Sequence, residues 1–172
     1  MARNFHTVTV TPVLVAAESA ANQVLFNPIE IPHAVGSHGG SAKLESIVIQ
    51  DKGDGLTLDF DLFFFGSNAG GNLGTINAAV DITDANLALN KPLGTVRIEA
   101  EDGNDTGDYL AGQLMTSSNV GLIVQSESNS GSIYVAARAV DAQTKAAAFT
   151  GEMGRYGDIL DSLDSEINSI LS

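Results

Sequence analysis

Residues that could do chemistry are few in this sequence, and two of them are close together. Asp59 and Asp61 are a pair of carboxylates of the kind that glycosidases use as acid and base. The stretch around them, 56–62, alternates apolar and polar residues, which predicts a strand with both carboxylates on one face. We expect that face to lie in water, where the two charges keep the protein soluble and do no catalysis.

Two other stretches resemble metal sites incompletely. Residues 102–107 (Asp-Gly-Asn-Asp-Thr-Gly) match the start of a calcium loop, but Gln113 stands where its bidentate glutamate belongs. His33 and His38 are five residues apart near Glu30, with no second cluster at ligand spacing. The chain has no cysteine, which excludes disulfides and zinc–thiolate sites. We therefore expect no enzyme activity, no metal and no cofactor, and leave open a weak structural calcium in the 101–108 loop.

The composition limits the kinds of partner that the chain can bind. Its 172 residues include 21 acidic and 8 basic ones, for a net charge of −13. Such a charge repels phosphate backbones and anionic lipids, so the chain is expected to bind neither nucleic acid nor membrane. No apolar stretch approaches the roughly 20 residues that cross a bilayer. The N-terminal stretch "MARNFHTVTVTPVLVAAESAA" resembles a signal peptide, but alternating Val and Thr favour a strand.

Short strands between turns are predicted to position these residues. A hairpin is expected to join 43–50 to 56–65 across "DKGDG", and a second to join 119–126 to 132–140. One helical turn over 83–89 is predicted, capped by Thr83 or Asp84. The remaining predicted strands cover 6–15, 76–82 and 93–100, with 23–35 an edge strand or extended loop because it contains Pro28 and Pro32.

This pattern predicts an all-β fold, a jelly-roll-like β-sandwich of about eight strands with a C-terminal amphipathic helix. The sandwich is expected to span 1–149, a Gly-rich hinge 150–157 and the helical tail 158–172. Apolar residues recur in the tail at helical spacing, so its stripe must be buried either on its own sheet or on a neighbouring chain. That stripe contains Ile159, Leu163, Ile167 and Ile170.

Two phenylalanines break the alternation of the stretch "LTLDFDLFFFGSN". Phe63 and Phe65 continue the face on which Asp59 and Asp61 lie, so a water-facing surface becomes aromatic. Three covers are possible: the second sheet of the sandwich, the tail helix, or another subunit.

The order of the segments, rather than any motif, resembles a known family. "TVTVTPVLVAAESAANQVLF" precedes "LESIVIQDKGDGLTLDFDLFFFGSN", followed by "AAVDITDANLALNKPLGTVRIEAEDGNDTGDY", "VGLIVQSESNSGSIYVAARA" and "VDAQT". This succession, over 7–144, is similar to small β-rich structural proteins of tailed bacteriophage virions. The helical tail after residue 145 departs from that pattern. The resemblance implies a jelly-roll-like head decoration or cement protein, often a trimer over the junctions between capsid subunits.

From this resemblance, which agrees with the all-β class that the residues predict, we expect a virion structural protein that stabilises the phage head by bridging capsid subunits. Its expected partners are the major capsid protein and itself, as a homotrimer, and its expected location is the capsid surface after synthesis in the host cytoplasm. A tail or neck component is the alternative, and a carbohydrate-binding or adhesion module is a more distant one. Interfaces need apolar aromatic anchors. The interface candidates are Phe63, Phe65, Tyr134, Ile159, Leu163, Ile167 and Ile170.

Overall fold

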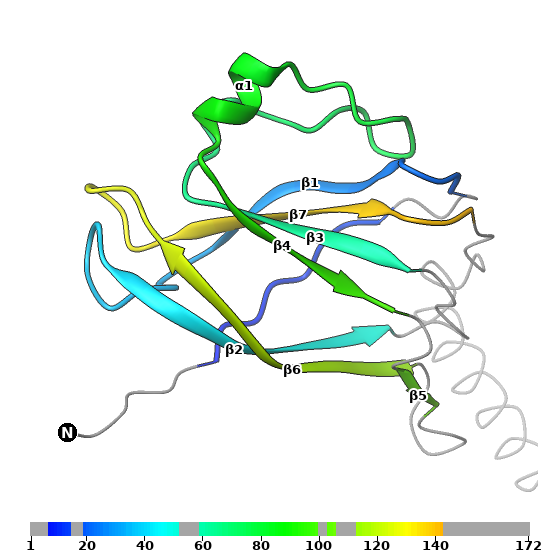
Figure 1. Cartoon of the computed structure of the whole chain (residues 1–172), viewed down its shortest axis with the longest axis horizontal. Coiled ribbons are helices and arrows are strands. Elements are labelled where there is room, and N and C mark those ends of the chain that lie inside the picture. Colours follow the sequence, from blue (N-terminus) through cyan, green and yellow to red (C-terminus); the bar gives the residue numbers. More distant parts are fainter. Residues whose placement is uncertain (1–6, 15–18, 52–58, 100–102, 106–112, 143–172) are drawn as a thin grey trace, which may run out of the picture.

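The computed structural model of the chain describes residues 7–14, 19–51, 59–99, 103–105 and 113–142 (Figure 1). In these residues it contains seven strands and one short helix. In chain order they are β1 (Val24–Ile31), β2 (Ser41–Asp51), β3 (Phe60–Phe65), α1 (Asp84–Leu89), β4 (Pro92–Ile98), β5 (Gly103–Asp105), β6 (Gln113–Gln125) and β7 (Ile133–Ala139).

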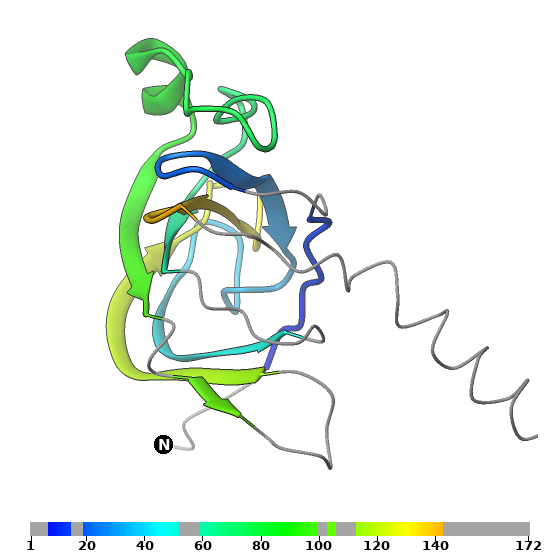
Figure 2. The ribbon, with the colours of Figure 1, turned by 90° about the vertical axis from the view of Figure 1, so that its right-hand side faces the viewer.

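The strands form two antiparallel sheets that face each other. One has the order β1-β7-β3-β4 and the other β2-β6-β5. Figure 2 looks along the layers and shows β4 beside β6 at one side of the molecule, where the two strands are in contact. The predicted all-β class is therefore confirmed. In the described residues, two of the eight predicted strands are absent from the sheets, namely 6–15 and 76–82, and β5 was not predicted. Residues 76–82 make only isolated bridges, from Ile76 to Val24 and from Ala79 to Gln23.

The main core lies between the two sheets and follows from the two-residue period of β-strands. On β3 the even-numbered Phe60, Leu62 and Phe64 point inward and are at most 6% exposed. β2 contributes half-buried aliphatic side chains from the facing layer. The buried members from the other strands and loops are Leu25, Phe26, Val35, Ile98, Val124, Ile133, Val135, Ala137 and Ala139.

Both predicted hairpins are wrong. β2 pairs with β6 and not with β3, while β3 lies between β4 and β7. Likewise β6 pairs with β2 and β5, and β7 pairs with β1 and β3. The chain therefore changes sheet between β2 and β3 and again between β6 and β7. A strand with one apolar face can bury it equally well beside a distant partner, so adjacency in sequence did not decide the pairing.

An irregularity in the β2–β6 ladder decides which side chains of β2 face the core. The ladder pairs Leu44 with Leu122 and then Ser46 with Ser118, so one residue of β2 faces three residues of β6. Asn119 and Gly121 in that insertion have φ values of 56° and 73°. A bulge of this kind reverses the alternation, so Leu44 and Ile47 share the core face.

The first described segment, 7–14, belongs to neither sheet, although 6–15 was predicted as a strand. Its burial still alternates, with even-numbered residues half-buried and odd-numbered ones exposed. Val10 and Leu14 pack against the main core. Of the edge strand or extended loop expected over 23–35, the structure shows an edge strand over Val24–Ile31, because β1 lies at the end of its sheet. The predicted hinge and helical tail, 150–172, lie outside the described residues, as do Ile159, Leu163, Ile167 and Ile170.

Candidate functional site

The three described interface candidates lie on one surface, the outer face of the β1-β7-β3-β4 sheet. The odd-numbered residues of β3 point to this face because the even-numbered ones fill the core. Residues directly opposite on neighbouring antiparallel strands share a face. The register therefore adds residues from β4 and β7. We call the resulting surface the aromatic–arginine face; it comprises Asp61, Phe63, Phe65, Arg97, Tyr134 and Arg138.

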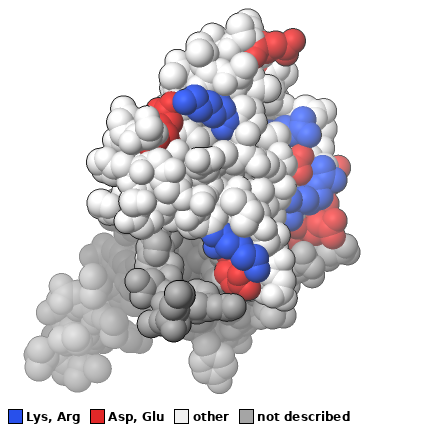
Figure 3. Space-filling model, turned by 60° about the vertical axis from the view of Figure 1, so that its left-hand side comes forward, with Lys and Arg blue, Asp and Glu red and all other residues white. Residues whose placement is uncertain are grey.

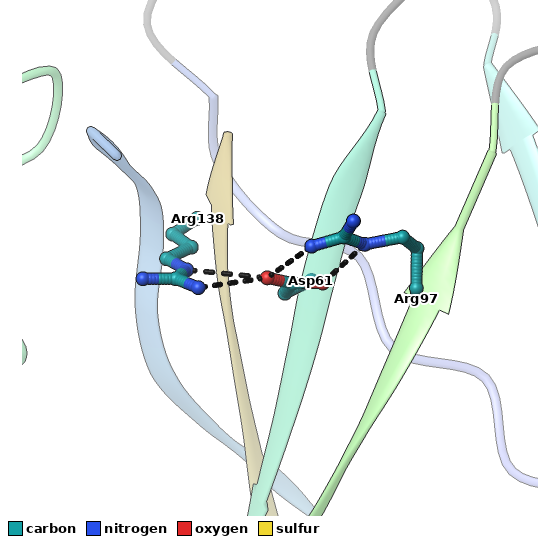
Figure 4. A network of polar contacts seen from close by, with 3 residues as sticks. All are labelled: Asp61, Arg97 and Arg138. Atoms are coloured by element: carbon teal, nitrogen blue, oxygen red, sulfur yellow. Dashed lines mark hydrogen bonds and ion pairs between the residues drawn. The ribbon is translucent and has the colours of Figure 1, made fainter. Parts of the chain in front are cut away.

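Asp61 is buried beneath two arginines and does not lie in water, contrary to the sequence expectation. It is 4% exposed, and the register places Arg97 and Arg138 directly opposite it on either side. Arg97 donates from Nε to Oδ1 at 2.9 Å and from Nη2 to Oδ2 at 3.2 Å. Arg138 donates from Nε and Nη2 to Oδ2 at 3.2 and 3.0 Å (Figure 4). The two arginine side chains cover the carboxylate, while Asp59 stays half-buried at the strand's start.

The electrostatics of this cluster keep Asp61 charged. Burial by itself would raise the pKa of Asp61, but hydrogen bonds from Arg97 and Arg138 and their positive charges outweigh it and lower the pKa below 3.8. The hydrogen bond to Asp61 in turn raises the pKa of Arg97. A carboxylate held in this way accepts hydrogen bonds at neutral pH and does not act as a general acid. The cost of removing Asp61 from water offsets much of its attraction to the two arginines. The main effect of the cluster is therefore to fix the two guanidinium groups in place.

The aromatic half of the face continues directly from this cluster. The rings of Phe63 and Phe65 stack with centroids 6.5 Å apart and planes at 15°. The guanidinium carbon of Arg138 lies 5.4 Å from the centroid of Phe63, within the range of a cation–π contact. Tyr134 is directly opposite Phe65 on β7. Phe63 and Tyr134 are half-buried, whereas Phe65 is only 1% exposed.

The cover of Phe65 is none of the three that the sequence suggested. It is the excursion between β3 and β4, residues 66–90, whose Leu73 forms a second buried cluster with Phe65, Val24 and Ala136. Figure 1 shows this excursion, including α1, above the sheet at the β1 side. Leu87 of α1 packs against the same cluster, and so does Ile82. The partly exposed Phe63 thus lies between the covered end of the face and the arginine cluster.

Two asparagines that sequence reasoning missed hold this cover in place. Asn90 is fully buried; its Oδ1 accepts from the Gly70 N–H at 2.7 Å and its Nδ2 donates to the Gly71 carbonyl at 2.9 Å. Gly70 approaches α1 so closely that a Cβ there would overlap the carbonyl of Asn86. Asn27 of β1 similarly bridges the excursion, accepting from the Leu73 N–H and donating to the Gly74 carbonyl, both at 2.8 Å.

The predicted helical turn is confirmed and gives the excursion its local order. α1 begins after Thr83, whose hydroxyl accepts from the Asn86 N–H at 3.3 Å. Asp84 lies in the first turn, where a negative charge favours the helix dipole. Asn90 ends α1 in the right-handed conformation, and the left-handed residue that follows is Lys91, so a capping preference alone would not have revealed the buried amide of Asn90.

Every lysine and arginine whose side chain the structure describes is in an ion pair. Besides the two arginines on Asp61, Lys43 lies 2.9 Å from Glu45 and Lys91 2.6 Å from Glu127. The hydrogen bond from Lys91 lowers the pKa of Glu127. Blue and red groups accordingly adjoin on the face that Figure 3 shows. This part of the chain has no unpaired basic cluster that could bind a phosphate backbone.

The structure adds little support for metal binding at the two incomplete sites. His33 and His38 line an open hollow of about 390 Å³ between the 33–38 loop and residues 129–132. Across the described ranges, no group of three or more His, Asp or Glu side chains is placed to hold one ion. Of residues 102–107, only β5 is described, so the calcium question lies outside the described residues. No described helix is long and apolar enough to cross a membrane.

Comparison with protein-family models, with curated proteins and with solved structures finds no match for this chain.

Proposed function

We propose that this chain is a structural protein of a virus particle, a decoration or cement protein that bridges capsid subunits of a tailed-phage head. The order of its segments, which resembles such proteins, supports the proposal, and so does its two-sheet β-fold. Jelly-roll connectivity and a trimeric state are part of the proposal. A tail or neck position in the same particle is the alternative.

The observation that carries the proposal is the aromatic–arginine face. The cores of protein interfaces are enriched in aromatic residues and arginine relative to the rest of the surface. Here the fold brings Phe63, Tyr134 and two arginines from three strands onto one rigid sheet. The side chains of Arg97 and Arg138 are 49% and 34% exposed, so a partner can still reach them.

The face is organised before any partner arrives. Asp61 orients both guanidinium groups, and the stacked neighbours fix the Phe63 ring. Association costs roughly 0.5–1.5 kcal/mol for each side chain that must be immobilised, and side chains already held avoid most of that cost. A partner surface with apolar groups opposite Phe63 and acceptor oxygens opposite the arginines fits this face.

Phe63→Ser should weaken binding to the capsid because it removes the exposed aromatic anchor. Heads assembled without this chain, from the phage that encodes it, are mixed with purified protein and the bound fraction is measured by sedimentation. We expect the Kd to rise about tenfold or more, which corresponds to about 1.4 kcal/mol. Circular dichroism at the assay temperature checks that the variant is folded.

Val48→Ser is the matched control, because Val48 is 61% exposed on the other sheet. It should leave the Kd unchanged. A folded Phe63→Ser protein that binds heads as tightly as wild type would exclude this face from the capsid interface. Wild-type protein that binds no head, but binds one glycan selectively on an array, would replace the proposal with an adhesion function.

A further inference from the structure

The segment 7–14 is extended like a strand but has no partner strand among the residues that the structure describes. It is extended, its side chains alternate between exposed and half-buried, and Val10 and Leu14 anchor it on the core. No backbone hydrogen bond joins it to another residue that the structure describes. Figure 2 shows it in dark blue, running from the level of the β2-β6-β5 sheet to that of the β1-β7-β3-β4 sheet.

An extended segment whose backbone groups pair with no described residue is a template for another strand. Threonine and valine are among the residues that strands favour most, and they make up the whole of residues 7–11. Val10 and Leu14 hold the segment on the core, so a second strand could add to it without first ordering it.

The sequence of this segment is complementary to itself. Residues 7–11 read Thr-Val-Thr-Val-Thr, which is the same in both directions. In an antiparallel pair centred on Thr9, Thr7 of one copy faces Thr11 of the other, and valine faces valine. Cross-strand pairs of β-branched residues and of threonines stabilise a sheet. All threonines then lie on the exposed face, and both pairs of valines remain on the side that packs on each copy's own core.

Pro12 selects which edge of the segment can pair. The N–H and C=O groups of successive residues point to opposite edges of a strand. Pro12 has no N–H and shares its edge with Val8 and Val10. The opposite edge, formed by the three threonines, has all its donors and acceptors. Pairing along it makes Thr9 the hydrogen-bonded residue on the two-fold axis.

Charge favours this place for contact between two copies. The chain carries a net charge of −13, so two copies repel each other over most approaches. Residues 7–14 contain no charged side chain. Together with the self-complementary sequence, this makes an identical segment the best-matched strand for the edge.

We propose that residues 7–11 form a two-fold interface between two copies of this chain, an antiparallel ribbon centred on Thr9. This two-fold contact is separate from the aromatic–arginine face and from the three-fold contacts of the proposed trimer, and it does not depend on a role in a virus particle.

Cysteine cross-linking tests the interface directly, because the native chain contains no cysteine. Thr9 lies opposite itself in the ribbon, where hydrogen-bonded partners have Cα atoms about 5.5 Å apart, within the range of a disulfide. The full chain with Thr9→Cys should form a covalent dimer on mild oxidation, seen on a non-reducing gel. Thr7→Cys should form it at least about tenfold more slowly, because the two residues would be about 14 Å apart along the ribbon.

The register has its own control. Thr7→Cys and Thr11→Cys chains, each slow to cross-link alone, should link to each other when mixed, and a size tag on one chain identifies the mixed dimer. Circular dichroism shows whether each variant folds, and these exposed positions should tolerate cysteine. The proposal fails if Thr9→Cys stays uncross-linked, or if Thr7→Cys links to itself as fast as Thr9→Cys does.

Discussion

Asp61 is the residue for which sequence reasoning and the structure differ most. On an alternating strand an acidic residue ordinarily indicates the water face, and the pattern around Asp61 is regular. What buries it are two arginines 36 and 77 residues further along the chain, brought opposite it by the strands on either side. Nothing in the local pattern distinguishes it from Asp59. Only the ladder register makes one of them the centre of a cluster.

The pH dependence of stability should report the Asp61 cluster. The arginines lower the pKa of Asp61 below 3.8, so its stabilising contribution is present above about pH 4 and is lost as the pH falls through the lowered pKa. In the double variant Arg97→Met/Arg138→Met, no arginine offsets the effect of burial, so the pKa of Asp61 rises. The carboxyl group then favours the folded state at low pH and opposes it as the pH rises above about 4. Urea unfolding at several pH values measures both profiles.

The comparison that isolates Asp61 is the same double variant carrying Asp61→Asn. This third protein lacks the titrating group, so it supplies the pH dependence of all other groups. If the double variant and the triple variant have parallel profiles between pH 3 and pH 7, Asp61 does not titrate as proposed.

At the scale of elements, the excursion 66–90 decides which part of the sheet stays accessible. It covers Phe65 and leaves Phe63 half-buried, although the two rings were equivalent in the sequence. The excursion contains few hydrogen-bonded elements of its own, and side-chain amides tie it down at two points. Its stability should therefore depend on Asn27 and Asn90 more than on the helix propensity of α1, which is only six residues long.

Asn90→Ala should loosen the cover of Phe65. It leaves the Gly70 N–H and the Gly71 carbonyl without their partner in a buried place, which costs about 1–3 kcal/mol. Asn86→Ala makes the same chemical change on the exposed surface of α1 and should change stability by about 0.5 kcal/mol or less. Denaturant unfolding gives both values. Equal losses for the two variants would show that Asn90 does not hold the excursion.

For the whole molecule, the distribution of charge controls assembly. The described basic side chains are all paired internally, so the net negative charge is not offset by a basic patch in this part of the chain. Any contact between copies therefore forms against long-range repulsion. An uncharged segment such as 7–14 is the kind of place where that repulsion costs least.

Added salt should strengthen self-association. Screening shortens the range of repulsion from about 10 Å at 0.1 M salt to about 3 Å at 1 M, while the backbone hydrogen bonds of an uncharged ribbon change little. Analytical ultracentrifugation across this range should show the dimer fraction rising with salt. Weaker association at high salt would instead indicate ion pairs across the interface, and would contradict a contact made by residues 7–11.

The sequence by itself determined features that depend on short stretches. These include the all-β class, the existence of β3 and β4, the capped turn at Thr83 and the alternating faces of 7–14, since side-chain periodicity and capping are local properties. They were enough to identify Phe63 and Phe65 as unusual. Tyr134 was a candidate only as an aromatic residue, and its place opposite Phe65 came from the strand register.

Only the tertiary structure decided which strands pair and what covers each face. A strand's period specifies that one side must be buried, but many partners can bury it, and the choice is made by the packing of the whole chain. The two predicted hairpins were therefore wrong, although the strands that they were expected to join were predicted. Packing of the whole chain also placed two distant arginines over Asp61 and the 66–90 excursion over Phe65. It left 7–14 extended without a described partner.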